Sequence, residues 1–372
     1  MSNLLLSDYN KIFLEDTPMI DLRSPAEFKQ GAFAHSTNFP LMSDDERAQI
    51  GLCYKKKGQQ QAIELGHQLV NGSKKEQRVE CWRQFAEQHP NKGILYCFRG
   101  GLRSRISQQW LSEAGVDLPI VHGGYKAMGR FLIDETQRLT ERTNIFVLTG
   151  FTGSAKTKII NRNRFSIDLE CLANHRGSSF GRRITPQPSQ IDFENSLAVE
   201  LLKLHHHIGN NLVLEDESRL IGARSIPLVI KQKMDVAPLV LIEQEFDYRV
   251  EQIYQDYVVA LASEFNAMYK QQSIVEYHQF LSDACTKISR RLGGVGLAKV
   301  LQLIEQAILL QQKNTSLLKH RDWIVYLLKN YYDPMYSYQI EKKKSRIIFQ
   351  GNMEQVSLFL DQISQVNVNG NR

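Results

Sequence analysis

The chain has 372 residues, whereas an ordinary domain has roughly 100–200, so we expect two or three compact units rather than one. Hydrophobic residues make up 42% and charged residues 23%, a balance that excludes a disordered or fibrous protein. The formal net charge is +6, which permits a polyanionic partner such as a nucleic acid without requiring one.

The five cysteines predict neither a disulfide framework nor a zinc site, because their number is odd and no Cys-x-x-Cys pair occurs. The segment from Met1 to Phe13 lacks the basic start and the apolar core of a signal peptide. No apolar stretch approaches the roughly 18 residues that span a bilayer. We therefore expect a cytoplasmic protein with no membrane association.

Two strand–loop–helix patterns occupy the first part of the chain. Residues 18–21 are predicted to form a short buried strand, and Ser24 follows as a helix N-cap, with Glu27 placed to complete a capping box. Residues 93–96 form a second predicted strand, and residues 106–111 begin the helix behind it. This alternation is typical of an α/β domain.

A second α/β unit is predicted to begin with a strand at residues 144–149, and a helix pattern resumes at Lys156. The polar segment 134–143 lacks a buried face, so we place the domain boundary there, between domains 1–137 and 138–372. Further helices are expected from the three-and-four spacing of apolar residues at 197–204, 250–265, 297–310 and 316–328, with Gly293 and Gly294 marking the entry to one of them.

The loop that begins at Cys97 is the most informative segment of the first domain. A cysteine at the carboxyl end of a strand, before a glycine-bearing loop and a helix, has backbone N–H groups aimed at its sulfur. Arg99 and Arg103 add positive charge, and Gly100 and Gly101 supply the turn. Such settings lower a cysteine pKa from about 8.5 to roughly 3.5–7.5, so we predict a reactive thiolate at Cys97 within an anion-binding loop.

Two chemistries fit this loop. Residues 97–104 match the C-x-x-G-x-x-R-S loop of cysteine-dependent phosphatases, in which the thiolate attacks phosphorus. In a sulfurtransferase the thiolate instead attacks sulfur or selenium and carries it. Residues 21–31 (Asp-x-Arg-Ser-Pro-x-Glu-Phe-x-x-Gly) resemble the opening of the rhodanese domain, a small α/β fold with its catalytic cysteine in this position. Because some phosphatases share that fold, this resemblance leaves the reaction open.

A phosphate loop follows the strand at 144–149. Residues 150–157 match G-x-x-x-x-G-K-[ST], except that Ala155 replaces the second glycine. In a P-loop, backbone N–H groups wrap a phosphate, and Lys156 neutralises terminal phosphoryl oxygens. The predicted phosphate-binding residues are Gly150, Thr152, Gly153, Ser154, Ala155, Lys156 and Thr157. Alanine disfavours positive φ, so Ala155 predicts a slightly displaced loop, or a pyrophosphate other than that of ATP.

A candidate Mg²⁺ site accompanies this loop. Residues 212–214 form a short apolar strand that ends in three acids, as in a Walker B element, and we predict that Thr157 and Asp216 hold the ion. We expect no tightly bound cofactor. The run of histidines at 205–207 is predicted to be a solvated helix face, because consecutive helix residues point about 100° apart and cannot converge on one metal.

Together, the two loops resemble those of the tRNA 2-selenouridine synthases, which join a rhodanese domain to a P-loop domain. Five further strings carry the resemblance: Gly123–Ala127, Asp168–Glu170, Ala173–Ser178, Glu215–Gly222 and Tyr332–Tyr336. Two positions depart from the family, Ala155 and Phe98, where glycine and tryptophan are expected. The resemblance implies a rhodanese-like α/β domain followed by a P-loop NTPase-like α/β domain with a largely helical C-terminal part.

The resemblance also implies a transferase activity. Wobble 2-thiouridine of tRNA would be converted to 2-selenouridine through S-geranyl-2-thiouridine, with geranyl diphosphate and selenophosphate as donors and Cys97 as the selenium carrier. The partner would be tRNA. Two rivals remain open from the residues: a rhodanese-fold cysteine phosphatase or sulfurtransferase fused to a nucleotide-binding module, and a non-catalytic protein that binds tRNA or a nucleotide.

Overall fold

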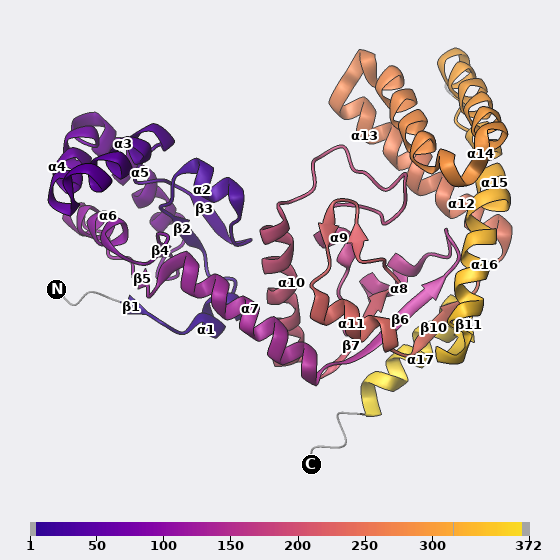
Figure 1. Cartoon of the computed structure of the whole chain (residues 1–372), viewed down its shortest axis with the longest axis horizontal. Helices are drawn as coiled ribbons and strands as arrows, with labels where there is room; N and C mark the ends of the chain where they lie inside the picture. Colours follow the sequence, from indigo (N-terminus) through magenta and orange to yellow (C-terminus); the bar gives the residue numbers. More distant parts are fainter. Residues whose placement is uncertain (1–4, 315, 367–372) are drawn as a thin grey trace. The chain divides into compact units, whose positions relative to one another are not determined.

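The computed structural model of the chain describes residues 5–314 and 316–366, which fall into two compact units. The first unit comprises residues up to Leu139 together with Ser189–Lys203, and the second comprises Thr140–Pro188 and the residues from Leu204 onward (Figure 1). The chain therefore returns to its first unit for one helical segment, which nothing in the sequence analysis indicated.

The first unit is built on five parallel strands in the order β1-β5-β4-β2-β3. The strands are β1 (Leu5–Leu6), β2 (Met19–Asp21), β3 (Ser36–Asn38), β4 (Ile94–Tyr96) and β5 (Ile120–Val121). The helices are α1 (Tyr9–Leu14), α2 (Pro25–Gln30), α3 (Asp44–Lys57), α4 (Gln59–Leu69), α5 (Gly72–Gln88), α6 (Leu102–Glu113) and most of both α7 (Gly124–Arg142) and α10 (Gln190–His207).

The predicted strands of this unit lie at the centre of the sheet. Ile20 pairs in register with Leu95, which pairs with Ile120, and all three side chains are almost completely buried. A parallel sheet covered on both faces favours such unbroken apolar strands. The helix predicted after Ser24 is confirmed: Ser24 is the N-cap of α2, and its N–H donates to the Glu27 carboxylate at 3.1 Å.

The second unit contains a parallel sheet in the order β11-β10-β6-β7. Its strands are β6 (Asn144–Gly150), β7 (Asn211–Glu215), β10 (Leu239–Ile242) and β11 (Ile347–Gly351), and a separate hairpin pairs β8 (Leu220–Ile221) with β9 (Arg224–Ser225). The helices that accompany the sheet are α8 (Lys156–Arg162), α9 (Leu169–Leu172), α11 (Leu228–Val236) and α17 (Met353–Val366).

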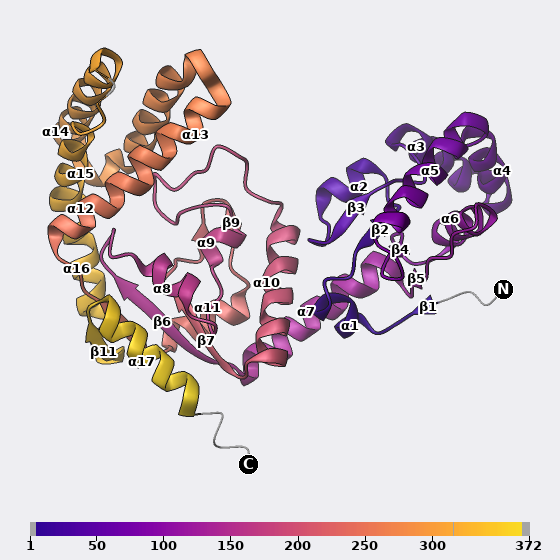
Figure 2. The same ribbon diagram turned by 180° about the vertical axis from the view of Figure 1, so that it is seen from behind.

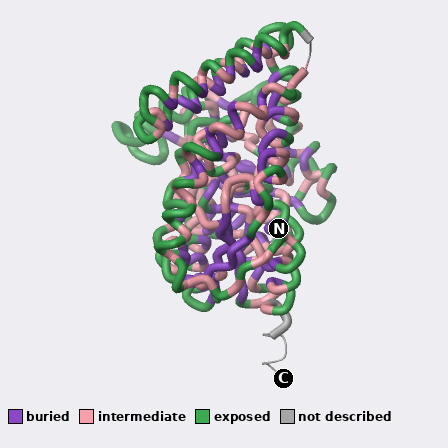
Figure 3. Tube along the Cα trace, turned by 90° about the vertical axis from the view of Figure 1, so that its right-hand side faces the viewer, coloured by how far each residue is buried: buried purple, intermediate pink, exposed green. Residues whose placement is uncertain are grey.

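The remaining helices of the second unit form a region with its own core (Figure 2). They are α12 (Phe246–Tyr254), α13 (Ala260–Tyr269), α14 (Ser273–Asn314), α15 (His320–Leu327) and α16 (Asp333–Lys342). Buried residues follow the inner sides of these helices and exposed residues follow the outer sides (Figure 3). Gly293 has a φ of 77° and interrupts α14, which confirms the predicted helix entry at Gly293 and Gly294.

Two expectations need correction. The segment 134–143 is the last part of α7 and the entry to β6, and it does have a buried side, formed by Thr136, Leu139, Thr140 and Thr143. Moreover, the helical run Phe246–Lys313 contains an 18-residue window with a mean hydropathy of 1.4, long and apolar enough by composition to cross a membrane. Core helices of globular proteins pass the same test, and α14 contributes buried side chains such as Ile304 to the helical core.

Candidate active sites

Cys97 directly follows β4 and is 3% exposed. The loop that follows it is held by main-chain hydrogen bonds from the start of α7. Tyr125 N–H donates to the Cys97 carbonyl at 2.9 Å, and Lys126 N–H donates to the Phe98 carbonyl at 3.0 Å. The cysteine is therefore fixed between the end of a central strand and the beginning of a helix.

Glycines make this close packing possible. Gly100 has a φ of +60°, and a Cβ atom there would lie 2.7 Å from the Val121 carbonyl oxygen. A Cβ atom on Gly124 would lie 2.2 Å from the Cys97 carbonyl oxygen. Distances below 3.0 Å are not found for real Cβ atoms, so both positions require glycine. The Gly123–Ala127 string thus belongs structurally to the cysteine loop.

The two arginines of the loop have different surroundings. Arg103 donates to the Glu27 carboxylate at 2.7 Å, and Arg47 approaches the same carboxylate at 3.1 Å. Burial acts to raise the pKa of Glu27, but these arginines and the Ser24 N–H hold that pKa below its usual range. The Arg99 guanidinium lies 5.9 Å from the centre of the Phe98 ring and forms no ion pair with a carboxylate among the described residues, so its charge is available to an incoming anion.

A pocket of about 530 Å³ opens beside Cys97. Its lining comes mainly from apolar side chains of α3, α4 and α6 and of the loop after β3. The residues that line it are Leu41, Met42, Ile50, Tyr54, Gln59, Ala62, Ile63, Gly66, His67, Val70, Cys97, Phe98, Arg99, Gly101, Leu102, Arg103, Ile106 and Trp110. This pocket could not be predicted from the sequence, because helices α3 and α4 carry no recognisable motif.

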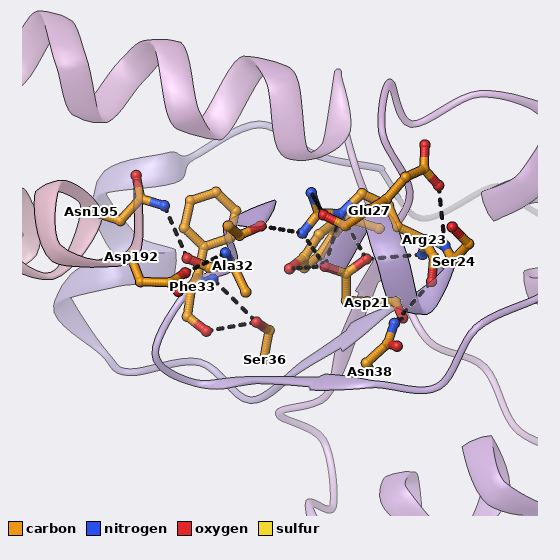
Figure 4. Close-up of polar contacts among 12 residues, drawn as sticks. Asp21, Arg23, Ser24, Glu27, Ala32, Phe33, Ser36, Asn38, Asp192 and Asn195 are labelled. Atoms are coloured by element: carbon orange, nitrogen blue, oxygen red, sulfur yellow. Dashed lines mark hydrogen bonds and ion pairs between the residues drawn. The ribbon is translucent and has the colours of Figure 1, made fainter. Parts of the chain in front are cut away.

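A buried ion pair supports the cysteine strand from the side (Figure 4). The Arg23 Nη2 atom lies 2.6 Å from Asp21 Oδ2, and both side chains are at most 2% exposed. The Tyr96 hydroxyl, on the strand that precedes Cys97, donates to the same oxygen at 2.8 Å. Arg23 also donates to the Gly31 carbonyl at 2.7 Å. These contacts give a structural role to Asp21, Arg23 and Gly31, three residues of the 21–31 string that resembles a rhodanese opening.

The returning segment completes this region. Ala32 N–H donates to the Asp192 carboxylate at 2.6 Å, and the Asn195 side chain donates to the Ala32 carbonyl at 2.9 Å (Figure 4). A Cβ atom on Gly31 would lie 2.5 Å from the Ile191 side chain. The start of α10 is thereby packed against the loop after α2.

The phosphate loop follows β6 and leads into α8 at Lys156. A Cβ atom on Gly150 would lie 2.6 Å from the Ile242 carbonyl oxygen, and one on Gly153 would lie 2.6 Å from the Arg249 carbonyl oxygen. Ala155 has φ 61° and ψ 34°, which is the left-handed conformation that glycine adopts most easily. The alanine therefore keeps the backbone conformation of the glycine it replaces.

The charged end of the loop is Lys156. Its ammonium group donates to the Gly150 carbonyl at 3.1 Å and to the Phe151 carbonyl at 3.3 Å, so the side chain curls back over the loop. The Ser154 hydroxyl is buried without a hydrogen-bond partner. A bound anion would give the Ser154 hydroxyl a hydrogen-bond partner and the Lys156 ammonium a negatively charged one.

Arg249 supports this loop, and sequence reasoning missed it. Its guanidinium donates to both Asp333 carboxylate oxygens, at 2.8 and 2.7 Å, and to the Thr152 carbonyl at 3.3 Å. The guanidinium also lies 5.1 Å from the centre of the Phe151 ring. The only available signal was Asp333 in the Tyr332–Tyr336 string, whose partner lies 84 residues earlier.

Three glutamates converge near the loop: Glu170, Glu215 and Glu217 each place a carboxylate oxygen within 4.8 Å of the others. Burial, followed by repulsion from neighbouring carboxylates, raises the pKa of Glu170 to about 9 and that of Glu217 to about 7. Burial also raises the pKa of Glu215, whereas Lys156 and a hydrogen bond with Thr157 act in the opposite direction. One Glu215 oxygen is buried without a partner.

Asp216, one of the two predicted Mg²⁺ ligands, has other contacts. The Lys343 ammonium lies 2.8 Å from each of its carboxylate oxygens, and the Thr149 hydroxyl donates to it at 2.9 Å. The other predicted ligand, Thr157, forms a side-chain hydrogen bond with Glu215. Carboxylate and hydroxyl oxygens are the ligands that Mg²⁺ prefers, and the partnerless oxygen of Glu215 suits a cation. The three glutamates with Thr157 therefore fit a divalent ion.

The histidines at the end of α10 form no metal-binding group among the described residues. His206 and His207 are exposed, and His205 Nε2 lies 2.7 Å from the Thr143 hydroxyl. Among the described residues, the three glutamates are the group that could hold a metal.

The two units define a class of protein. One carries a cysteine loop at the end of a central strand of a small parallel sheet, as in a rhodanese-like domain, and the other carries a P-loop between a parallel strand and a helix. A family model described as "tRNA 2-selenouridine synthase AAA domain" matches residues 143–366. The predicted α/β fold class, with its helical C-terminal part, is confirmed.

Similar proteins identify the family. Proteins named tRNA 2-selenouridine synthase from Marinobacter nauticus, Azotobacter vinelandii and Pseudomonas fluorescens (strain Pf-5) are 47%, 49% and 49% identical to this chain. The matches cover 94%, 98% and 96% of this chain and 95%, 99% and 98% of the relatives. The chain belongs to the tRNA 2-selenouridine synthase family, and it is an enzyme.

One solved structure, the N-terminal domain of a putative ATP/GTP binding protein from Clostridium difficile 630, is 26% identical to part of the chain. It covers 35% of this chain and 98% of its own, with a TM-score of 0.31, which is too low to support a structural comparison.

Proposed function

We propose that this enzyme converts 2-thiouridine at the wobble position of tRNA to 2-selenouridine through an S-geranyl intermediate. Modification of tRNA to contain selenouridine follows from membership of the family, whose members carry that activity in their names. The two donors, the intermediate and the division of labour between the two loops are our inference.

The first step is assigned to the phosphate loop. The backbone N–H groups of residues 150–155 and the Lys156 ammonium would hold the diphosphate of geranyl diphosphate. The sulfur of 2-thiouridine attacks the first carbon of the geranyl group, and diphosphate leaves with the electron pair of the carbon–oxygen bond. Thr157 and the three glutamates would hold a divalent ion, which when bound neutralises charge on the departing diphosphate. The Arg249–Asp333 pair keeps the loop in place.

The second step is assigned to Cys97. Alkylation turns the sulfur on the pyrimidine into a better leaving group, because it departs as geranylthiol rather than as sulfide. Arg99 would hold the anionic donor beside Cys97.

Selenium in selenophosphate is at the selenide level, so a covalent Cys97–selenium carrier would need an oxidant, and the thiolate is assigned to phosphorus instead. The Cys97 thiolate attacks phosphorus, and selenium leaves as hydrogen selenide with the electron pair of the phosphorus–selenium bond. The hydrogen selenide attacks C2 of the pyrimidine and displaces geranylthiolate, which takes up the proton. Water then hydrolyses the phosphocysteine to phosphate and the free thiol.

One observation supports the proposal: each unit places a glycine-bearing loop between an inner strand of its sheet and a helix, and the two loops carry different chemical groups. Cys97 supplies a nucleophile in one, whereas Lys156 and the glutamates supply electrostatic stabilisation in the other. A reaction with two phosphorylated donors requires two such sites.

The test is nucleoside mass spectrometry of a 2-thiouridine-containing tRNA incubated with the purified full chain. We expect S-geranyl-2-thiouridine with geranyl diphosphate alone, and 2-selenouridine when selenophosphate is added. Selenouridine formed without geranyl diphosphate would overturn the intermediate. Cys97-dependent release of phosphate from an aryl phosphate, with no change in the tRNA, would favour the phosphatase instead.

A further inference from the structure

The pocket beside Cys97 differs from what an anion site alone requires. Leu41, Met42, Ala62 and Val70 on its lining are buried, so its walls are well packed. Tyr54 and Leu102, which also line it, are 58% and 44% exposed. Large apolar side chains that face solvent from a concave surface are typical of a ligand-binding site.

Selenophosphate does not need such a surface, because it is small and fully polar. The loop backbone and Arg99 are enough to bind its negative charge, and they line only a small part of the pocket. A volume of about 530 Å³ lies in the range of pockets that take small organic ligands. The remaining apolar walls, from α3, α4 and α6, therefore indicate a ligand with a hydrocarbon part that reaches Cys97.

We infer that this pocket binds the geranyl chain of S-geranyl-2-thiouridine while selenium is delivered to C2. The inference rests on the proposed function and deepens it, because it makes the first unit a prenyl-recognition site as well as the site of selenium delivery. Burial of each methylene group contributes about a fourfold gain in binding, so a ten-carbon chain provides strong selection over short alkyl groups. The geranyl chain then contributes to substrate binding and is also part of the leaving group.

The α3 helix offers a matched pair of variants. Ile50 lines the pocket and is partly buried, whereas Leu52, two residues later, is 53% exposed and does not line it. Ile50→Trp fills the pocket, and Leu52→Trp adds the same side chain to the surface. Ile63→Trp, on α4, fills the pocket from a second helix if Ile50→Trp fails to fold.

The first measurement compares kcat/KM for selenation of S-geranyl- and S-methyl-2-thiouridine in the same anticodon stem-loop. We expect a preference for S-geranyl of at least about 100-fold in the wild type and in Leu52→Trp. The pocket-filling variants should lose at least about tenfold of that preference. Equal use of the two substrates by the wild type, or a preference that survives both pocket-filling variants, would overturn the inference.

The second measurement needs neither tRNA nor donors. Hexyl and methyl methanethiosulfonate transfer their alkylthio group to a thiolate and release methanesulfinate, and peptide mass spectrometry reports each cysteine separately. We expect the hexyl-over-methyl rate ratio to be at least about tenfold higher at Cys97 than at the exposed Cys81, and to fall in Ile50→Trp. Equal ratios at the two cysteines would contradict the pocket. A retained ratio without selenation of either substrate would instead contradict the proposed function.

Discussion

The cysteine loop and the phosphate loop begin alike and end in different chemistry. Each follows a buried parallel strand, turns through glycines and enters a helix, which is the arrangement that aims backbone N–H groups at an anion. The cysteine loop is bordered by an apolar pocket, whereas the phosphate loop is bordered by three carboxylates. The two local motifs thus have the same backbone arrangement, and the residues that surround each loop come from segments distant in sequence.

Each loop also has an arginine–aspartate pair beside it. In the first unit, Asp21 and Arg23 are two residues apart and at most 2% exposed. In the second, Arg249 and Asp333 are 84 residues apart, and the Asp333 side chain is 22% exposed. The first pair stabilises the strand region of its sheet, whereas the second links the phosphate loop to the helical region. Four predictions test how far this comparison holds.

The largest effects should come from substitutions that disable one loop at a time. We expect Cys97→Ser to lower selenouridine formation by more than about 10³-fold while S-geranyl-2-thiouridine accumulates, because the thiolate that releases selenide from selenophosphate is lost. Lys156→Ala should lower geranylation by about 10²–10³-fold and leave selenation of pre-geranylated tRNA unchanged. Nucleoside mass spectrometry measures both. Cys81→Ser is the control for the first, and loss of both steps in either variant would show that the loops do not act separately.

The two arginine–aspartate pairs should differ in their contribution to stability. Asp21→Asn leaves the Arg23 charge buried and unpaired, which costs about 3–5 kcal/mol of the free energy of unfolding of the first unit. Asp333→Asn should cost less, because water reaches its side chain. Hydrogen exchange with mass spectrometry follows β2 and β4 separately from β6 and α8. A larger loss from Asp333→Asn would reverse the comparison.

The metal site should depend on Glu215 rather than Asp216. Glu215→Gln removes a carboxylate with a partnerless oxygen, and we expect the Mg²⁺ needed for half-maximal binding of geranyl diphosphate to rise roughly 100-fold. Asp216→Asn should change it by less than about tenfold, because Lys343 already occupies that carboxylate. Calorimetry at several Mg²⁺ concentrations provides the measurement. The opposite ranking would restore Asp216 as the ligand.

The smallest effect should come from Ala155. Its positive φ costs roughly 1 kcal/mol that glycine would not, so Ala155→Gly should raise the free energy of unfolding of the second unit by up to about 1 kcal/mol. Part of that gain is offset by the greater freedom of glycine in the unfolded chain. Ala298→Gly, at an exposed position inside α14, is the matched control and should destabilise by about 1 kcal/mol. Denaturant unfolding measures the free energy of unfolding of each variant. A lower value in both variants than in the wild type would exclude strain at Ala155.

Several parts of the fold could be predicted because their signals are local. The strands β2, β4, β6 and β7 are short apolar runs before a turn, and the helices α2 and α8 begin at recognisable residues. Both loops were found for the same reason, since each motif lies within eight or nine consecutive residues. The buried side of α7 was missed, because its threonines do not look apolar in sequence even though they are buried.

Local sequence patterns were enough to locate the cysteine loop and the phosphate loop, to indicate an α/β fold for each unit and, through strings in both halves, to show the resemblance to a family. Other features became apparent only from the folded chain. The tertiary structure brought Arg249 to Asp333, placed Glu215 beside Thr157 and Lys343 beside Asp216, and built an apolar pocket at Cys97 from α3, α4 and α6. These features depend on contacts between segments far apart in the chain, and no spacing within a single segment encodes such contacts.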